Sequence, residues 1–221
     1  MHYNKKILIL TDSLAFPRSE PEYVSYGETY ISLLKENYPH IDFIHYGHGG
    51  STIVNLYEYS KYFHDTIEPD LVFIQCGVVD CAPRALTFTE QQIVKRLPLI
   101  NKFLVYLVKR FAKELRSIRK ISYTSKDVFA EYIDIFEKTF KNVVWINIMP
   151  PPDYYQEQIP NILASINDFN SLFNSRNHIA TSAFNESDIM RDGHHMSLAG
   201  HKKLALLMVE HINGLERERQ H

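Results

Sequence analysis

Ile7-Leu8-Ile9-Leu10-Thr11-Asp12-Ser13-Leu14 is an apolar run that passes directly into polar residues near the start of a 221-residue chain. Four consecutive branched aliphatic residues predict a strand buried on both faces, which is typical of a parallel sheet. The polar residues then fall at the carboxyl end of this strand, the edge at which α/β proteins gather their functional groups. The stretch therefore predicts both an α/β fold and the place of its chemistry.

Apolar runs of strand length recur along the chain, and segments with helical periodicity separate them. Strands are predicted at Ile7–Leu10, Ile41–Tyr46, Leu71–Gln75 and Val143–Ile148, with a short fifth strand near His178–Ser182. Helices are predicted at Tyr23–Asn37, Thr52–His64, Thr89–Lys120, Lys126–Phe140, Glu157–Asn174 and Ser197–Asn213. Because strands that alternate with helices form a parallel sheet, we expect a three-layer α/β/α sandwich around a parallel five-stranded sheet of flavodoxin type.

Length and composition fit one domain over residues 1–221. The chain is 45% hydrophobic and 13% aromatic, enough to bury a sizeable core. A helical elaboration is predicted at about 85–140, interrupted near Pro98, and a charged tail at about 214–221. Since the stretch Thr89–Lys120 within it is longer than a crossover between strands needs, it forms a lid, an oligomer contact or an added helical layer, and we favour the layer.

The charge balance excludes several classes of partner. Lysine and arginine total 24 against 26 acidic residues, a formal net charge of −2, which gives no electrostatic case for nucleic acid or an anionic membrane surface. The basic cluster between Lys95 and Lys120 is interpreted as a solvated helix face. No apolar run approaches the ~18 residues of a membrane span, so no integral membrane segment is expected. A short N-terminal apolar run and two cysteines interpreted as free thiols, Cys76 and Cys81, predict a cytoplasmic location.

A second polar cluster, Asp192-Gly193-His194-His195, lies near the far end of the chain. A serine after the first strand and an Asp-x-x-His motif supply the residue types that acyl transfer at serine requires. A serine hydroxyl is a weak nucleophile until a neutral imidazole takes its proton, and a carboxylate must hold that imidazole in one tautomer. The sequence therefore predicts Ser13 as nucleophile, His195 as base and Asp192 as the group that orients it.

Other chemistries fit the sequence less well. A lipase of the α/β-hydrolase type needs a Gly-x-Ser-x-Gly elbow, which this sequence lacks. A phosphate-binding loop needs a lysine after its glycines, but Gly47-His48-Gly49-Gly50 continues without one. His45, His48 and His194 have no supporting acidic or cysteine ligands at metal-binding spacing, so structural or surface roles are expected for them. We expect neither a cofactor nor a metal.

Four separated blocks of the chain resemble the SGNH (GDSL-type) hydrolase family. The blocks are Asp12-Ser13-Leu14, Gly47-His48-Gly49-Gly50-Ser51-Thr52, Gly77-Val78-Val79-Asp80, and Asp192 with His195. The resemblance implies the SGNH fold, an acyl-enzyme intermediate on Ser13, and an oxyanion hole made by the backbone NH groups of Ser13 and Gly50. Two positions depart from the family pattern: Thr11 stands where glycine is usual, and Val79 stands where an asparagine donates to the oxyanion.

The missing asparagine predicts a slow or specialised hydrolase, because one lost oxyanion donor costs about 3–4 kcal/mol. Arg18 follows Pro17 and Arg84 follows Pro83, both at predicted strand ends. Two converging guanidinium groups bind phosphate or carboxylate in bidentate fashion, so both arginines are assigned to an anionic part of the substrate. Arg84 alternatively supplies the donor missing at Val79. Asp80 is assigned to the same region, where it organises the loop rather than reacts.

The segment Asp80-Cys81-Ala82-Pro83-Arg84 resembles family members found with surface-polysaccharide biosynthesis genes. These observations predict a serine esterase or O-deacetylase whose small-molecule or glycan substrate is an acylated carbohydrate, anionic where the arginines bind it. One alternative is a carbohydrate O-acyltransferase, in which a sugar hydroxyl replaces water as acyl acceptor. The other is a catalytically weak carbohydrate-binding protein on the same fold, which Val79 favours. No oligomeric state is assigned.

Overall fold

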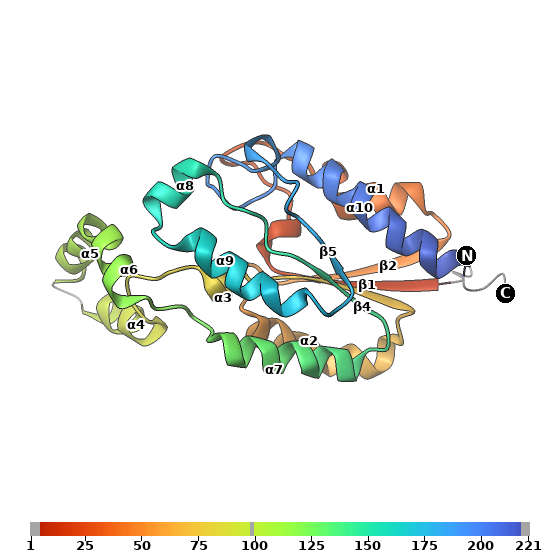
Figure 1. Ribbon diagram of the computed structural model, residues 1–221, viewed down its shortest axis with the longest axis horizontal. Helices are drawn as coiled ribbons and strands as arrows, with labels where there is room; N and C mark the ends of the chain where they lie inside the picture. Colours follow the sequence, from red (N-terminus) through yellow and green to blue (C-terminus); the bar gives the residue numbers. More distant parts are fainter. Residues whose placement is uncertain (1–4, 98–99, 218–221) are drawn as a thin grey trace.

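The computed structural model describes residues 5–97 and 100–217, and its centre is a five-stranded sheet (Figure 1). The strands are β1 (Lys5–Thr11), β2 (Ile41–Gly47), β3 (Leu71–Gln75), β4 (Val143–Ile146) and β5 (His178–Ile179). They stand in the order β2-β1-β3-β4-β5, and every neighbouring pair is parallel. The predicted parallel five-stranded sheet is therefore confirmed, with a fifth strand shorter than expected.

Ten helices connect and cover these strands within the described ranges. They are α1 (Tyr30–Asn37), α2 (Ile53–Ile67), α3 (Val78–Cys81), α4 (Phe88–Arg96), α5 (Asn101–Arg110), α6 (Ala112–Arg119), α7 (Lys126–Thr139), α8 (Asp153–Gln158), α9 (Ile162–Asn170) and α10 (Leu198–Arg217). Single turns of 3₁₀ helix lie at η1 (Ser13–Ala15), η2 (Tyr26–Glu28), η3 (Ser171–Phe173) and η4 (Glu186–Asp188). Among the helices of this described part, none is long and apolar enough to cross a membrane.

The helices make two layers around the sheet (Figure 1). Helices α1 and α10 pack together on one face, and α2 and α7 pack together on the other, with α9 beside α7. The aromatic rings of Phe129 in α7 and Phe169 in α9 meet at 5.0 Å, and Trp145 of β4 lies 5.9 Å from Phe136. Every residue of β3 and β4 is buried. Apolar burial on both faces of the sheet stabilises the three-layer sandwich that the sequence predicted.

Two predicted helices are interrupted for local reasons. The segment predicted as Tyr23–Asn37 turns first at η2 and becomes helical only after Thr29, whose side chain accepts a hydrogen bond from the Ser32 backbone NH as an N-cap. The segment predicted as Glu157–Asn174 breaks between α8 and α9 around Pro160, which has no backbone NH to donate and cannot continue a helix.

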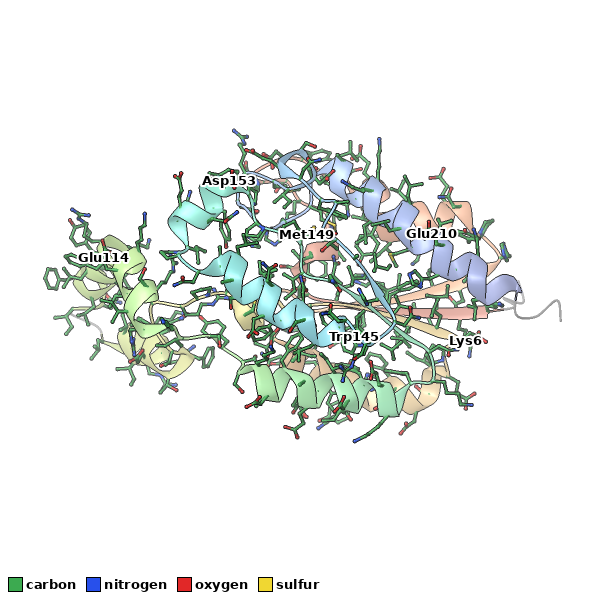
Figure 2. All side chains as sticks on the ribbon, viewed as in Figure 1. Lys6, Glu114, Trp145, Met149, Asp153 and Glu210 are labelled. Atoms are coloured by element: carbon green, nitrogen blue, oxygen red, sulfur yellow. The ribbon has the colours of Figure 1, made fainter. Side chains whose placement is uncertain are left out.

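The predicted long helix over Thr89–Lys120 is three shorter helices, α4, α5 and α6, which stand off the end of the sheet (Figure 1, yellow-green). We call residues 88–119 the helical arm. None of its three helices contains a buried residue, whereas α7 packs against the sheet domain. In Figure 2 the Trp145 side chain lies inside the sandwich, while Glu114 sits out on the arm. The interpretation of this stretch as an added helical layer is therefore wrong; the predicted interruption at Pro98 and tail residues 218–221 lie outside the described residues.

The register of the sheet brings the predicted chemistry to one edge. Thr11, the last residue of β1, pairs with Gly47 at the end of β2 and with Gln75 at the end of β3. The three loops that follow these strand ends therefore start side by side at the carboxyl edge of the sheet, where parallel α/β sheets place their functional groups.

Candidate active site

Ser13 stands in the first loop of this edge, one residue after the buried Asp12 and at the start of η1. The Asp12 carboxylate accepts a hydrogen bond from the Leu14 backbone NH at 2.9 Å, which shapes the turn that presents Ser13. Burial raises the pKa of Asp12 to about 7, so this carboxyl group is largely protonated below neutral pH. Asp12 therefore acts on the turn rather than as a charged member of the site.

Ser13 contacts a histidine that is 182 positions away in the chain. Its Oγ lies 3.0 Å from Nε2 of His195, and Nδ1 of His195 lies 2.7 Å from Oδ2 of Asp192. The other oxygen of Asp192 accepts the His195 backbone NH at 3.0 Å. With Nδ1 donating to the carboxylate, Nε2 carries no proton of its own and can accept that of serine. The fold thus aligns hydroxyl, imidazole and carboxylate in the order that nucleophilic catalysis at serine requires.

The charge state of Asp192 suits proton transfer along this relay of Ser13, His195 and Asp192. Burial opposes its ionisation, but hydrogen bonds from the side chain and backbone of His195 outweigh burial and hold the pKa of Asp192 well below its usual range. The carboxylate is therefore charged at neutral pH and keeps the Nδ1 proton on His195. Only this tautomer leaves Nε2 able to accept a proton from Ser13.

The ring of the neighbouring His194 lies beside that of His195, with centroids 4.0 Å apart. Its ring contacts Tyr155, with centroids 5.8 Å apart, and burial lowers its pKa. Its Nδ1 lies 3.1 Å from the Asp192 backbone oxygen. Gly193, directly before His194, has a φ of +85°, which favours glycine. A Cβ at this position would collide with the Tyr155 ring. The histidine spaced three residues after Asp192 is thus the one that reaches Ser13, as the family spacing implied.

The second loop brings Gly49 close to Ser13. A Cβ placed on Gly49 would lie 3.9 Å from Cβ of Ser13, while a Cβ on Gly50 would meet no atom within 4 Å. Gly50 adopts a φ of +71°, which favours glycine, and the His48 backbone NH anchors the loop by donating to the Thr11 carbonyl at 2.9 Å. The open space at Gly50 is compatible with the predicted oxyanion position, whereas the contact at Gly49 carried no sequence signal beyond the glycine run itself.

The third loop is organised by Asp80, which is fully buried. Its carboxylate accepts the Ile53 backbone NH at 3.0 and 3.1 Å and the Thr124 hydroxyl at 2.5 Å. These bonds tie the start of α2 and the approach to α7 to the loop, and burial raises the pKa of Asp80 to about 6. With no exposed surface, Asp80 cannot contact a substrate directly in this arrangement. Its assignment among the substrate-binding residues is corrected to the organising role that the sequence also indicated.

Arg18 lies against His195, and its Nη2 contacts Nε2 of that ring. The loop that carries it is fixed by paired backbone hydrogen bonds between Arg18 and Val24, at 2.9 and 2.8 Å. Burial lowers the pKa of Arg18, opposed mainly by the charge of Asp192, and its buried Nε has no hydrogen-bond partner. A guanidinium with an unused donor therefore sits at the nitrogen that must accept the serine proton.

Arg84 occupies a different place from Arg18. Its Nη2 donates to the Val79 carbonyl at 2.9 Å, and its guanidinium lies 4.3 Å from the Tyr123 ring centroid. Its backbone NH donates to the Ile121 carbonyl at 2.7 Å, at the junction with the helical arm. The predicted convergence of the two arginines is not observed, because Arg18 contacts the triad whereas Arg84 is held by the third loop.

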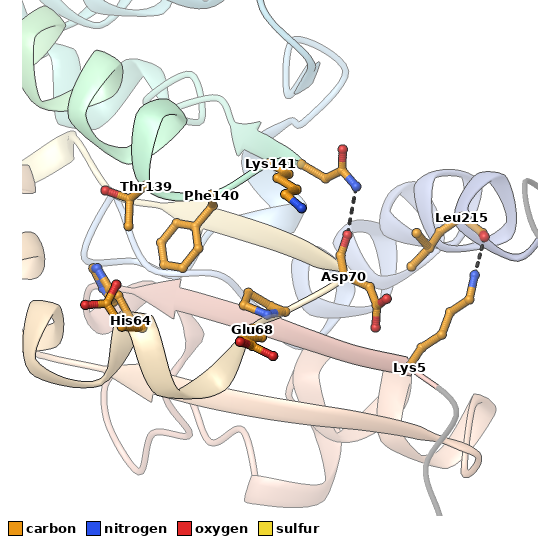
Figure 3. Close-up of a pocket in the computed structure, with 11 residues that line it drawn as sticks. Lys5, His64, Glu68, Asp70, Thr139, Phe140, Lys141 and Leu215 are labelled. Carbon is orange, nitrogen blue, oxygen red and sulfur yellow. Dashed lines mark hydrogen bonds between the residues drawn. The ribbon is translucent and has the colours of Figure 1, made fainter.

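Cavities around the sheet differ in their relation to this site. One cavity of about 800 Å³ lies at the opposite end, among residues at the starts of the strands (Figure 3). There Lys5 donates to the Leu215 carbonyl and Asn142 donates to the Asp70 carbonyl, the latter at 2.9 Å (Figure 3). A second cavity of about 540 Å³ begins at Gly50 and is lined also by Tyr59, Tyr123 and Phe88 of the arm. This second cavity adjoins the loop that carries Gly50, and neither of these two cavities is lined by Ser13, so size alone does not locate the chemistry.

Several residues of interest are engaged in structural contacts. Asp192, His194 and His195 have potential metal-binding atoms within 4.8 Å of one another, but both ring nitrogens of His195 already serve Ser13 and Asp192. The predicted structural roles of two other histidines fit their bonds, from His45 to the Thr11 hydroxyl at 2.9 Å and from His48 to the Ser51 hydroxyl at 2.7 Å. The cysteines Cys76 and Cys81 are buried free thiols, as expected, and burial raises the pKa of both.

No protein-family model matches the chain, and no curated protein matches its sequence. Solved structures do match its fold. A lipase/acylhydrolase from Enterococcus faecalis superposes with a TM-score of 0.63 at 16% identity over 95% of this chain and 96% of that one. A member of the lipolytic G-D-S-L family from Veillonella parvula gives 0.56 at 12% identity over 93% and 96%, and an acetyl xylan esterase from Geobacillus stearothermophilus gives 0.53 at 16% identity over 94% of both chains. The chain therefore has the fold of the SGNH (GDSL-type) hydrolases.

Proposed function

We propose that this chain is a serine esterase of the SGNH type that removes an acyl group from a carbohydrate ester through an acyl-Ser13 intermediate. The observation that carries the proposal is the relay from Ser13 Oγ to His195 Nε2 at 3.0 Å and from His195 Nδ1 to Asp192 at 2.7 Å. A shared fold alone would not support catalysis, since folds host unrelated functions. The aligned triad supplies the chemistry.

In the first half of the reaction, Ser13 Oγ attacks the ester carbonyl while His195 Nε2 takes its proton. The tetrahedral intermediate collapses as the ester C–O bond breaks, and His195 returns the proton to the leaving alkoxide. In the second half, a water molecule gives one proton to His195 and attacks the acyl-serine. Collapse releases the carboxylic acid, and His195 returns the proton to Ser13 Oγ. Asp192 stabilises the imidazolium in both halves.

The oxyanion site of this esterase relies on backbone donors. The NH groups of Ser13 and Gly50 do not depend on side-chain identity, so they serve this role although Val79 supplies no side-chain donor. One missing donor typically lowers the catalytic rate by about 10²–10³-fold. We therefore propose a slow enzyme, or one that gains transition-state stabilisation from its own substrate.

The proposed substrate is an acylated carbohydrate or glycan precursor that carries an anionic group. Acetyl xylan esterases share the fold, which supports carbohydrate esters as a class. The position of Arg18 supports the anion, because its Nη2 contacts His195 and its Nε has no partner. A phosphate or carboxylate on the substrate would bind these donors in bidentate fashion and draw the guanidinium away from Nε2.

Labelling with a fluorophosphonate tests the nucleophile, since this reagent modifies activated serines. The native protein should be labelled and should hydrolyse a small activated acetyl ester, and Ser13→Ala should lose both while keeping its circular dichroism spectrum. Ser187→Ala, at an exposed serine outside the relay, is the matched control and should behave as the native protein. Equal labelling of Ser13→Ala would reject the assignment. A native protein that is folded but unlabelled and inactive would favour the carbohydrate-binding alternative.

A further inference from the structure

The helical arm presents an apolar surface that no part of the described chain covers. Ile93, Phe103, Tyr106 and Ile118 have exposed fractions of 56%, 61%, 62% and 79%. Exposed apolar side chains that occur singly are ordinary, but a concentration in one small element marks an interaction surface. In Figure 2 the side chains of the arm extend around its helices, many of them into open space.

The arm also concentrates positive charge. Residues 88–120 contain nine lysines and arginines and two acidic residues, whereas the rest of the chain contains 15 against 24. The segment therefore carries a formal charge of +7 on a body of −9. The net charge of −2 gave no reason to expect an anionic partner, because it averages these two opposite parts. A Debye length of about 8 Å at physiological salt lets the arm act as a separate basic surface.

Helix α5 shows how the two properties combine. Leu104 and Leu107 are half-buried, on the side that meets the other arm helices, and the exposed positions lie on the opposite side. Because residues three and four apart share a helix face, Lys102, Tyr106 and Arg110 form one exposed row. Aromatic rings and long cationic side chains on one exposed face are the pattern of helices that lie in the headgroup region of a membrane.

We propose that the helical arm docks this protein on an anionic lipid bilayer. The lysines and arginines contact lipid headgroups, and apolar side chains such as Phe103 enter the boundary with the acyl chains. Nucleic acid fits this surface less well: its bases could stack on Phe103 or Tyr106, but the exposed Ile93 and Ile118 would stay uncovered. A symmetric contact between two copies of residues 88–120 would bring +7 against +7, which disfavours a second copy as occupant.

The arm lies at the same end of the molecule as the candidate active site, so docking would bring that site close to the bilayer. The arm leaves the sandwich at the carboxyl end of the sheet, the end that carries Ser13, as Figure 1 shows. Phe88, the first residue of the arm, lines the cavity that begins at Gly50. A docked arm therefore holds this end of the molecule against the bilayer, which would favour esters carried by the membrane if the proposed function holds.

Vesicle co-sedimentation tests the docking with the full chain. The probes are vesicles of phosphatidylcholine with and without phosphatidylglycerol, at low and high salt. We expect binding to the anionic vesicles that falls by at least about tenfold at 1 M salt, where the Debye length is about 3 Å. The double variant Lys102→Glu with Tyr106→Ser should weaken binding by at least about tenfold, since each cation near an anionic surface contributes strongly.

A matched control lies on α10. Lys202→Glu with Leu206→Ser alters an exposed lysine and an exposed leucine at the same four-residue spacing, changes the net charge equally, and should bind within about twofold of the native protein. Equal losses in both double variants, or equal binding to both kinds of vesicle, would overturn the proposal. Duplex DNA bound as tightly as the vesicles, or self-association that the arm variant abolishes without vesicles, would also overturn it.

The docking test does not depend on catalysis. Ser13→Ala should bind anionic vesicles as the native protein does, and the arm variant should hydrolyse a small soluble ester at the native rate. An active esterase that does not dock would contradict the docking proposal alone. A protein that docks but is inactive would contradict the proposed function alone.

Discussion

The strand-end site and the helical arm lie at the same end of the molecule and are built in opposite ways. In the site, His195 is buried and hydrogen-bonded at both ring nitrogens, and the carboxylate of Asp80 ties two loops together. In the arm no helix has a buried residue, and large apolar side chains such as Phe103 face outward. The difference indicates a division of roles between the two regions. The site holds its side chains in fixed positions, and the arm offers an uncovered surface for contact with another structure.

The attachment of the arm fits this division. The Arg119–Glu90 ion pair at 2.7 Å lies within the arm, whereas Arg116 reaches the Gln158 carbonyl of the sandwich at 3.2 Å. Gln91 and Arg119 also bond to Tyr123 and to the Ala85 carbonyl, so the arm is held mainly at its base. These contacts are partly exposed, and exposed ion pairs contribute little stability. Elements with little buried apolar contact open at low free energy, so we expect the arm to exchange its amide hydrogens before the sheet does.

The largest expected effect concerns the strand-end site, where replacing His195 and replacing His194 should change activity very differently. His195→Ala should lower kcat/KM for a small acetyl ester by about 10⁴-fold or more, because the base that activates Ser13 is lost. His194→Ala should stay within about tenfold of the native value, since its ring contacts Tyr155 and not Ser13. Steady-state hydrolysis with both variants measures this. A loss confined to His194→Ala would show that the triad is misassigned.

Sequence patterns predicted the sheet because its evidence is local. The apolar runs of β1, β3 and β4 are continuous, and alternation with helices fixes their parallel direction. The Ser13–His195 contact joins residues 182 positions apart, so it came from the family resemblance and not from spacing alone. No periodicity could show that Arg18 lies on His195 while Arg84 turns to Val79, because such contacts depend on side-chain directions in the folded loops.

The prediction of an added helical layer at the arm was wrong for a specific physical reason. Apolar residues at helical spacing predict an amphipathic helix, but the pattern does not say whether the apolar side is covered by the same chain. In α7 such residues, including Phe129 and Phe136, pack into the core, whereas in α5 the exposed Phe103 and Tyr106 find no cover within the described residues. Only the three-dimensional placement distinguishes a core helix from a docking helix.

A matched pair of phenylalanines tests the contrast in packing directly. Phe129→Ala removes a ring with no exposed surface and should lower the free energy of unfolding by about 3–5 kcal/mol, because it leaves a cavity in the core. Phe103→Ala removes a ring that is 61% exposed and should change it by at most about 0.5 kcal/mol. Urea unfolding followed by circular dichroism provides the measurement. Similar losses for both would mean that the arm is covered in solution, as in a stable oligomer.

The smallest expected effect concerns the two arginines. Arg18 contacts His195 in the site, whereas Arg84 lies in the third loop, next to the arm. Arg18→Gln should reduce kcat/KM about 10–100-fold for an ester that carries a phosphate or carboxylate, since a charge-assisted bidentate contact is worth about 1.5–3 kcal/mol. Hydrolysis of a neutral ester should be unchanged or faster, because Nη2 of Arg18 no longer competes for His195 Nε2.

Arg84→Gln is the matched control, because it removes the same charge from a guanidinium that Val79 and Tyr123 hold. If Arg84 replaces the oxyanion donor missing at Val79, its loss should slow charged and neutral esters alike, since both pass through the same tetrahedral oxyanion. Measuring kcat/KM for both esters in both variants separates anion binding from oxyanion stabilisation. An equal loss for both esters in Arg18→Gln would remove the case for an anionic substrate, and Arg18 would then act only by positioning His195.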